Sequence, residues 1–272
     1  MLIIGEKINA TRKGIAEAIK NRNAEAITRV ARAQAEAGAD VIDVNSTSGE
    51  SGISEKIEDM RWTVGVAQNA VDKPLAIDSD IPDVMDVGLE SATGPTPWVN
   101  SVTAELERLE RILPLVKKYG GPAVALCIAD EGIPRDVAGR LRAAQIIFEA
   151  GTKLGIEPER FYFDPLVMPI STEKEAGVII LETLSQIKER FPGAKTIVGL
   201  SNISYGLPLR AELNSIFLAL CMGAGLDAAI LDPINNDAMT TFRAANALLG
   251  NDNFCRRFTK HYRSKIKEDD IG

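Results

Sequence analysis

Histidine is almost absent from this sequence of 272 residues: the single copy is His261, in a charged segment near the end. Catalytic triads that use histidine, and most zinc sites, need imidazole among their core groups. We therefore expect neither kind of site here. Acid–base chemistry would have to rest on carboxylates, lysine, tyrosine, amides or the substrate itself.

Cysteine pairs, long apolar runs and excess positive charge are missing too. Cys127, Cys221 and Cys255 are far apart, and no basic leader with a long apolar core follows Met1. No apolar run approaches the roughly 18 residues that a membrane span needs. We therefore expect reduced thiols in a cytoplasmic protein with no membrane contact. The net charge of −7 argues against a nucleic-acid partner, and the basic segment 254–267 is predicted to be a solvated terminal helix.

Short apolar runs alternate with longer amphipathic stretches along the whole chain. The runs are rich in Val, Ile and Leu, as is typical of strands buried on both faces of a parallel sheet. The predicted strands are 2–8, 39–45, 74–79, 97–102, 123–129, 160–166, 196–202 and 227–233. The predicted helices are 25–38, 55–70, 82–91, 105–120, 137–154, 173–190, 209–223 and 237–249.

Eight strand–helix units without a Ser/Pro-rich linker predict one (β/α)₈ TIM barrel over residues 1–272. The alternative is an open doubly wound sheet. That fold usually carries a glycine-rich phosphate turn after its first strand. Here the first strand runs into "GEKINATRKG", which lacks the GxGxxG pattern.

Polar side chains stand at the predicted carboxyl ends of nearly every strand, where TIM barrels place their active sites. They are Glu6, Asn9, Asp43, Asn45, Asp78, Asn100, Asp130, Asp164, Asn202 and Asp232. Asp and Asn also cap helices and form turns, and we assign Asp130 and Asp232 to that structural role. Asp43, Asp78, Asn100 and Asp164 follow apolar or aromatic residues, so each is predicted to occupy the last position of its strand.

A ring of carboxylates and amides suits either a hard metal ion or a flat heterocycle with several N–H donors. Asparagine is a poor main ligand for a metal, but it offers a heterocycle both a donor and an acceptor. The asparagines in this set favour the heterocycle and predict a site without bound metal. A metal-dependent lyase or aldolase on the same barrel stays open as an alternative.

Several segments resemble a known family: "GADVIDVN", "AIDS", "VNS", "YFDPL" and "GLSNISYGLPLR…LNSIFL…AGLDAAILDP". They are similar to the pterin-binding barrels, above all to methyltetrahydrofolate:corrinoid methyltransferases and the folate domain of cobalamin-dependent methionine synthase. The resemblance spans residues 2 to about 250. "GADVIDVN" alone is less specific, because dihydropteroate synthases share it.

The resemblance implies tetrahydrofolate or 5-methyltetrahydrofolate as substrate and assigns roles to single residues. Asp164 would accept paired hydrogen bonds from the pterin 2-amino group and N3–H, and Asp78 and Asn100 would hold the other ring nitrogens. Asn202 would accept a hydrogen bond from protonated N5, the nitrogen that carries the methyl group. Gly199 and Ser201 would keep the rim clear for the ring. The remaining cavity-lining residues would be Glu6, Asn9, Asp43 and Asn45.

The resemblance also implies partners. His261 is followed by "YRSKIK", so it does not fit an Asp-x-His-x-x-Gly cobalt-ligand motif. The cobalamin-type corrinoid would therefore be carried by a separate protein, and the enzyme itself is expected to be a homodimer. Two rivals remain open: a dihydropteroate synthase-like enzyme and a non-catalytic pterin-binding subunit of a corrinoid complex. The resemblance implies that dihydropteroate synthases bind the departing pyrophosphate with basic groups near strands 7 and 8. The predicted ends of these two strands in this sequence contain no Lys, Arg or His, which argues against the first rival.

Overall fold

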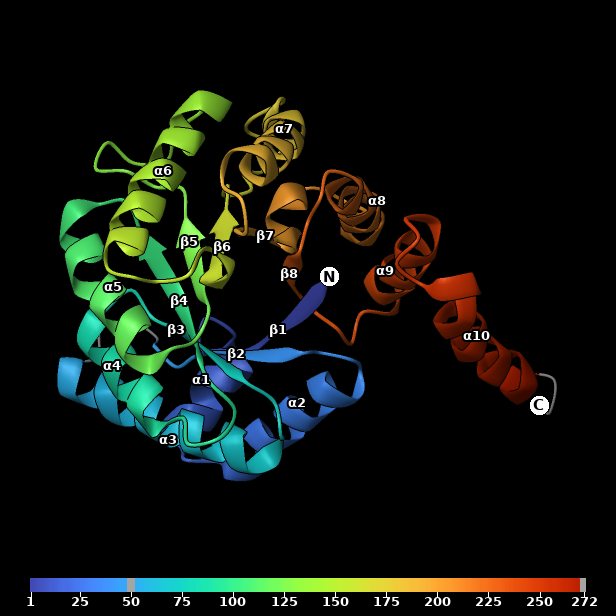
Figure 1. Ribbon diagram of the computed structural model, residues 1–272. Coiled ribbons are helices and arrows are strands. Elements are labelled where there is room, and N and C mark those ends of the chain that lie inside the picture. Colours follow the sequence, from blue (N-terminus) through green and yellow to red (C-terminus); the bar gives the residue numbers. More distant parts are fainter. Residues whose placement is uncertain (48–51, 270–272) are drawn as a thin grey trace.

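Each predicted apolar run forms a strand, and the eight strands hydrogen-bond in chain order into a closed parallel barrel (Figure 1). The computed structural model describes residues 1–47 and 52–269, with side chains as far as Arg263. The strands are β1 (Leu2–Asn9), β2 (Val41–Asn45), β3 (Leu75–Asp78), β4 (Trp98–Thr103), β5 (Ala123–Leu126), β6 (Phe161–Asp164), β7 (Lys195–Gly199) and β8 (Ala228–Leu231). The (β/α)₈ prediction is confirmed, and the open-sheet alternative is wrong because β1 pairs with β8.

The predicted helices all form on the outside of the barrel. They are α2 (Ala24–Glu36), α3 (Ile53–Ala70), α4 (Pro82–Ser91), α5 (Leu106–Tyr119), α6 (Val137–Lys153), α7 (Ala176–Arg190), α8 (Arg210–Gly223) and α9 (Asn236–Leu248). The structure adds the short helix α1 (Lys13–Lys20) after β1, and the basic segment forms α10 (Arg256–Asp269), which extends away from the barrel (Figure 1). The described residues also form three 3₁₀ turns: η1 (Pro158–Arg160), η2 (Leu200–Ser204) and η3 (Asn253–Cys255).

The inner floor of the barrel is apolar, and every strand contributes one buried side chain to it. These are Ile4, Val41, Ala76, Trp98, Val124, Tyr162, Ile197 and Ala228. The rings of Trp98 and Tyr162 lie 4.5 Å apart between centroids and fill much of the centre. Because side chains alternate along a strand, the residue two positions later on each strand also faces inward, one layer nearer the carboxyl end. The floor therefore determines which residues form the next layer.

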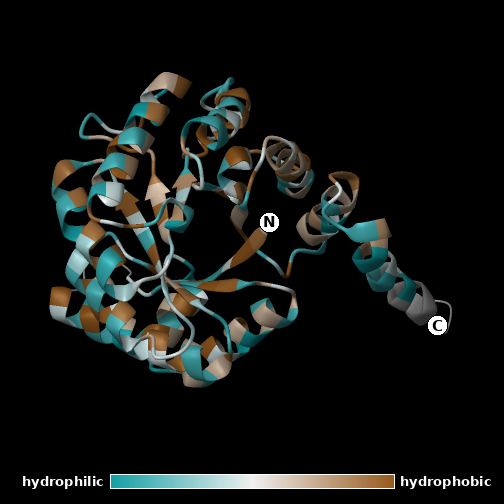
Figure 2. Cartoon of the chain, in the orientation of Figure 1, coloured by the Kyte–Doolittle hydropathy of each residue, from teal (hydrophilic) through white to brown (hydrophobic). Residues whose placement is uncertain are grey.

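The outer faces of the strands bury a larger apolar cluster against the helices. Ile42, Ile77, Val99 and Phe163 are fully buried there. Figure 2 shows much of the strands in hydrophobic colouring and hydrophilic colouring in the first turns of α10. No helix in residues 1–47 or 52–269 is long and apolar enough to cross a membrane.

Candidate functional site

The layer above the apolar floor is largely polar. Counting two residues on from each floor residue gives Glu6, Asp43, Asp78, Asn100, Leu126, Asp164, Gly199 and Ile230. Carboxylates or an amide therefore point inward from β1, β2, β3, β4 and β6, directly on top of a packed hydrophobic layer. This places most of the predicted site residues in a single ring at the carboxyl end of the barrel, where active sites of this fold lie.

Three positional predictions are wrong in detail. Asp43 is the third of five residues in β2, and Asn100 is the third of six in β4, so neither ends its strand. The physical reason is that the ladder of backbone hydrogen bonds continues past an inward polar side chain. Strand β7 ends at Gly199, and Asn202 lies in the following turn η2. Asp78 and Asp164 do end their strands as predicted.

Two hydrogen bonds connect the amides to the carboxylates of this ring. Asn100 Nδ2 donates to Asp43 Oδ1 at 2.9 Å, and Asn45 Nδ2 donates to Asp78 Oδ2 at 3.0 Å. Asn45 Oδ1 is also occupied, since it accepts from the backbone N–H of Thr47 at 3.1 Å. In the described part of the chain no group donates to Asn100 Oδ1, so this acceptor is available to a ligand.

Burial makes ionisation of these carboxylates costly. Burial, and then the nearby Asp78 charge, raises the pKa of Asp43 well above its ordinary value, and the Asn100 hydrogen bond opposes the rise. Burial also raises the pKa of Asp78, against the Asn45 hydrogen bond. Two buried carboxyls that repel one another do not both ionise readily. The pair can therefore retain a proton close to the centre of the site.

Asp164 stands apart from that pair, on β6, and is 5% exposed. Its Oδ1 accepts from the backbone N–H of Leu166 at 2.7 Å, which fixes the plane of the carboxyl group. Burial raises its pKa to about 6, while the Leu166 and Gly199 N–H groups and the Arg140 charge oppose the rise. The carboxylate is therefore ionised at neutral pH and oriented to accept paired hydrogen bonds.

Gly199 leaves a gap in the ring, and Asn202 lies over it. A Cβ atom at position 199 would stand 3.2 Å from Asn202 Nδ2, so the absence of a side chain gives the amide its place. Asn202 is exposed. Its backbone carbonyl accepts from the N–H of Tyr205 at 3.1 Å, but its side-chain amide makes no hydrogen bond within the described residues. By contrast, the turn itself is held: Arg210 Nη2 donates to the Ser201 carbonyl at 2.8 Å, and Arg210 Nε donates to Ser204 Oγ at 3.1 Å.

The β1 side of the mouth carries a group of opposed charges. The pairing of β1 with β2 shifts register between Gly5 and Ile8, and Gln34 Oε1 accepts the freed N–H of Lys7 at 2.8 Å. Lys7 Nζ then reaches Asp232 Oδ2 at 2.5 Å. Burial raises the pKa of Glu6, and Arg12, 3.4 Å away, opposes the rise.

The remaining predicted rim residues serve local structure. Asn9 Oδ1 accepts from the backbone N–H and the hydroxyl of Thr11, at 2.9 and 2.7 Å, so this side chain closes a turn. Asp130 Oδ1 accepts from the N–H of Leu106 at 3.2 Å. Asp232 Oδ1 accepts from the N–H of Ile234 at 3.1 Å, besides pairing with Lys7. The contacts of Asp130 and Asp232 agree with the structural role assigned to them from the sequence.

Basic residues near the site were not predicted from the sequence: Lys7, Arg12, Arg140 and Arg210. Lys7 and Arg210 reach the mouth only because β1 closes on β8 and α8 follows η2. Arg140 belongs to the buried face of α6, with Leu141, Ala144 and Ile147. The sequence did contain a sign of Arg140: it is a charged residue on the apolar face of the helix predicted over 137–154. Such a residue is unusual there because long charged side chains normally stay in water.

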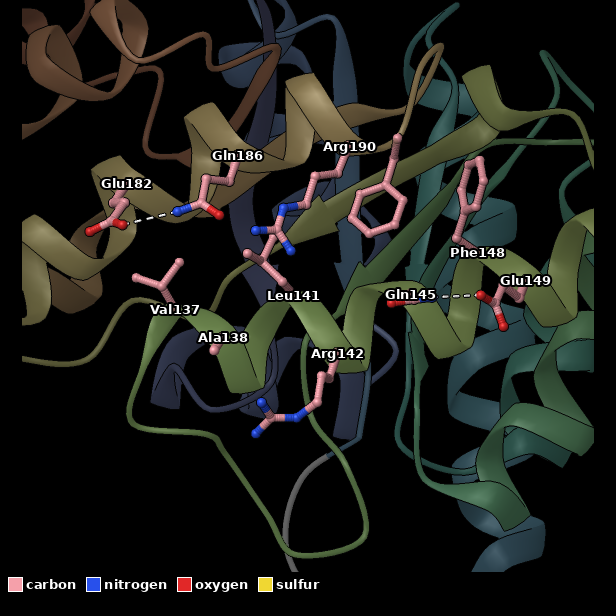
Figure 3. Close-up of a pocket in the computed structure, with 11 residues that line it drawn as sticks. Val137, Ala138, Leu141, Arg142, Gln145, Phe148, Glu149, Glu182, Gln186 and Arg190 are labelled. Carbon is pink, nitrogen blue, oxygen red and sulfur yellow. Dashed lines mark hydrogen bonds between the residues drawn. The ribbon is translucent and has the colours of Figure 1, made fainter.

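Two further features of the described residues concern metal ligands and cavities. Within residues 1–47 and 52–269, no three His, Cys, Asp or Glu side chains are grouped so as to hold a metal ion. A cavity of about 660 Å³ lies on the outer surface between α6 and α7 (Figure 3). It is lined by residues such as Gln145 and Gln186, each bonded to a glutamate of its own helix. It contains none of the ring residues, so we do not assign the site to it.

The comparisons with known proteins agree with the geometry. Residues 5–232 match the family described as pterin binding enzyme. The chain belongs to this family. This chain is 35% identical to the methylcorrinoid:tetrahydrofolate methyltransferase of Eubacterium limosum. The alignment covers 97% of this chain and 96% of that relative.

Two other similar proteins are a longer relative and a solved structure. The methionine synthase of Mycobacterium tuberculosis is 31% identical over 85% of this chain, which spans 20% of that longer protein. Among solved structures, the dihydropteroate synthase of Stenotrophomonas maltophilia superposes with a TM-score of 0.72 at 16% identity, covering 91% of this chain and 92% of that one. A likeness at that identity establishes the shared barrel fold and no more.

Proposed function

We propose that this pterin-binding enzyme is a methyltransferase that moves a methyl group between N5 of tetrahydrofolate and the cobalt of a corrinoid held by a separate protein. The observation that carries the proposal is Asn202, whose amide is unpaired within the described residues and lies over Gly199 beside the ring of acceptors. The full-length relationship to a protein named for this reaction supports it.

The pterin ring would lie on the apolar floor with its nitrogens against the polar layer. Asp164, already fixed by the Leu166 N–H, would accept from the 2-amino group and N3–H. Two parallel hydrogen bonds to one carboxylate are strong and orient the ring in its plane. Asp78 and the free oxygen of Asn100 would hold the other ring nitrogens.

The role of Asn202 follows from the charge that develops on N5. A methyl group leaves an amine nitrogen readily only when the nitrogen gains positive character, and the reverse reaction creates the same charge. A neutral amide cannot supply a proton, but its oxygen can accept a hydrogen bond from N5–H. That contact strengthens as charge develops, which is how a group stabilises a transition state. Asp43 and Asp78 are the residues that could retain the proton.

The remaining partners belong to the proposal as well. The corrinoid held by the partner protein would supply the methyl donor or acceptor. This chain would contribute binding, orientation and N5 polarisation without a metal of its own. The Eubacterium limosum relative is named for transfer from a methylcorrinoid to tetrahydrofolate, which supports the same direction as part of this proposal. We further propose a homodimer located in the cytoplasm.

A dihydropteroate synthase activity is disfavoured by the charges at the mouth. The structure does bring basic side chains there, contrary to what the strand ends alone indicate. Lys7 is, however, neutralised by Asp232, and Arg210 donates its hydrogen bonds to η2. A departing pyrophosphate would have to break these contacts to find a cation. A non-catalytic pterin-binding role is disfavoured because ring binding by itself does not require an amide near N5.

The test combines binding and turnover. Calorimetry in EDTA should show tetrahydrofolate and 5-methyltetrahydrofolate binding without added metal. Anaerobic incubation with methylcobalamin and tetrahydrofolate should then yield 5-methyltetrahydrofolate, with the loss of methylcobalamin followed by absorbance. Failure of both folates to bind would overturn the proposal. Folate binding without methyl transfer from methylcobalamin or from a purified methylated corrinoid protein would favour the non-catalytic alternative. Formation of dihydropteroate would favour the synthase.

A further inference from the structure

Arg108 holds the backbone at the ends of two neighbouring strands of the barrel. It lies in the first turn of α5, and its two terminal nitrogens donate to three backbone carbonyls. Nη2 donates to the Ser101 carbonyl at 2.8 Å and to the Ser79 carbonyl at 3.5 Å, and Nη1 donates to the Asp80 carbonyl. Ser79 and Ser101 directly follow two residues of the polar ring, Asp78 and Asn100. One guanidinium therefore joins the two chain segments where they leave the ring.

The backbone ladder between β3 and β4 stops at these same residues. Asp78 and Asn100 form the last paired position of the two strands, and the Ser79 N–H donates to the Asn100 carbonyl at 3.0 Å. Beyond this bond β3 ends, whereas β4 continues to Thr103. Backbone carbonyls need donors where a ladder ends, and a guanidinium offers five N–H groups in a rigid fork. Arg108 thus continues the connection one residue further along each chain.

The segment that Arg108 holds also contains an irregularity of β4. The pairing of β4 with β5 shifts register between Asn100 and Val102. Val99 and Val102 are both fully buried in the outer apolar cluster although they are three residues apart, so Ser101 is the extra residue of a β-bulge. A bulge bends its strand and changes the direction of neighbouring side chains. The direction of the Asn100 amide therefore depends on how Ser101 is held.

The guanidinium of Arg108 is placed for these carbonyls and not for an ion pair. Its Nε is buried and has no hydrogen-bond partner in the described part of the chain, where Arg108 forms no salt bridge either. An unpaired buried N–H costs free energy, and the contacts of the terminal nitrogens offset that cost. Arg111, one turn further along α5, differs: it pairs with the carboxylate of Asp83 at the surface.

We propose that Arg108 is a positioning residue of the pterin site. It ties the bulge after Asn100 to the end of β3, so that Asn100 Oδ1 lies where a ring nitrogen can donate to it. The inference rests on the proposed function and extends it by a residue that lies behind the ring. Asn100 Oδ1 has no donor among the described residues, and a displacement of about 1 Å is enough to lose a hydrogen bond to it.

A purely structural role of Arg108 predicts a different result. Arg108 would then only stabilise the loop after β3, so its loss would lower the free energy of unfolding and leave the folate affinity of the folded protein unchanged. A positioning role predicts a lower affinity, and the loss should depend on the presence of Asn100. A double-mutant cycle separates the two roles, because effects at independent sites add and effects within one network do not.

The experiment measures 5-methyltetrahydrofolate affinity by calorimetry for wild type and Arg108→Met, which keeps the length of the side chain without its N–H donors. Affinity should fall about 3- to 10-fold, which corresponds to the loss of one hydrogen bond. On an Asn100→Ala background the same substitution should change affinity by less than about twofold. On an Asn202→Ala background, at the opposite side of the mouth, it should again cost about 3- to 10-fold.

Matched controls keep the result decisive. Arg111→Met removes a cation of the same helix and should leave the affinity unchanged. Urea unfolding checks that each variant is folded; Arg108→Gln replaces Arg108→Met, and Asn100→Ser replaces Asn100→Ala, where the first choice does not fold. Unchanged affinity in the folded Arg108 variant, or an equal loss on the Asn100 background, would overturn the inference. Absence of folate binding by wild type would instead overturn the proposed function.

Discussion

Replacing Asp164 by Asn should make the free protein more stable and the folate complex weaker. The pKa of this carboxyl rises from its ordinary value of 3.8 to about 6 in the folded protein, chiefly through burial. A raised folded pKa means that the group favours folding fully only below about pH 4, and that this contribution is lost as the pH rises through about 6. The difference corresponds to about 3 kcal/mol against the folded state above that range.

Asparagine is nearly isosteric, and its Oδ1 can still accept the Leu166 N–H that now lies at 2.7 Å. We therefore expect Asp164→Asn to raise the free energy of unfolding by up to about 3 kcal/mol at about pH 8 and to change it little at about pH 4. Urea unfolding of both proteins without folate, at these two pH values, measures the effect. Asp136→Asn is the matched control: it removes a carboxylate that caps α6 at the surface and should bring no such gain.

The same substitution should weaken folate binding at about pH 8. It sets an amide N–H against a ring N–H, and an unpaired buried polar group costs about 1–3 kcal/mol. The expected loss of affinity is therefore about 5- to 150-fold. The reasoning is refuted if the variant is less stable than wild type at about pH 8, or if its folate affinity is unchanged.

Three other expectations concern the mouth and the surface. Asn202→Ala should lower the single-turnover rate of methyl transfer about 10²–10³-fold, while a lost neutral contact costs folate affinity only about 0.5–1.5 kcal/mol; a rate that falls merely in proportion to affinity would contradict this role. Gly199→Ala should slow transfer by displacing Asn202, because the new Cβ would stand 3.2 Å from its Nδ2, and an unaffected rate would show that the amide is not needed there. Light scattering should give about twice the chain mass of 29.3 kDa, and a value near the single-chain mass would argue against the homodimer.

The sequence by itself determined the barrel and most of its polar ring. Short Val- and Ile-rich runs separated by amphipathic stretches can bury both faces only as parallel strands covered by helices. Closing such strands into a barrel puts their carboxyl ends together, so Glu6, Asp78 and Asp164 were bound to meet. These conclusions depend on the local pattern of apolar and polar residues and on the order of the elements, and the sequence contains both.

Only the tertiary structure decided which side chains share a layer and which charges oppose one another. The pairing of Asn100 with Asp43 and of Asn45 with Asp78 depends on strand register, which no single strand encodes. The position of Asn202 over Gly199 depends on a 3₁₀ turn where the sequence indicated a strand. The closure between β1 and β8 brings Lys7 to Asp232. Contacts between residues far apart in the chain are determined by how helices and strands pack. Hydrophobic periodicity within one segment therefore does not predict them.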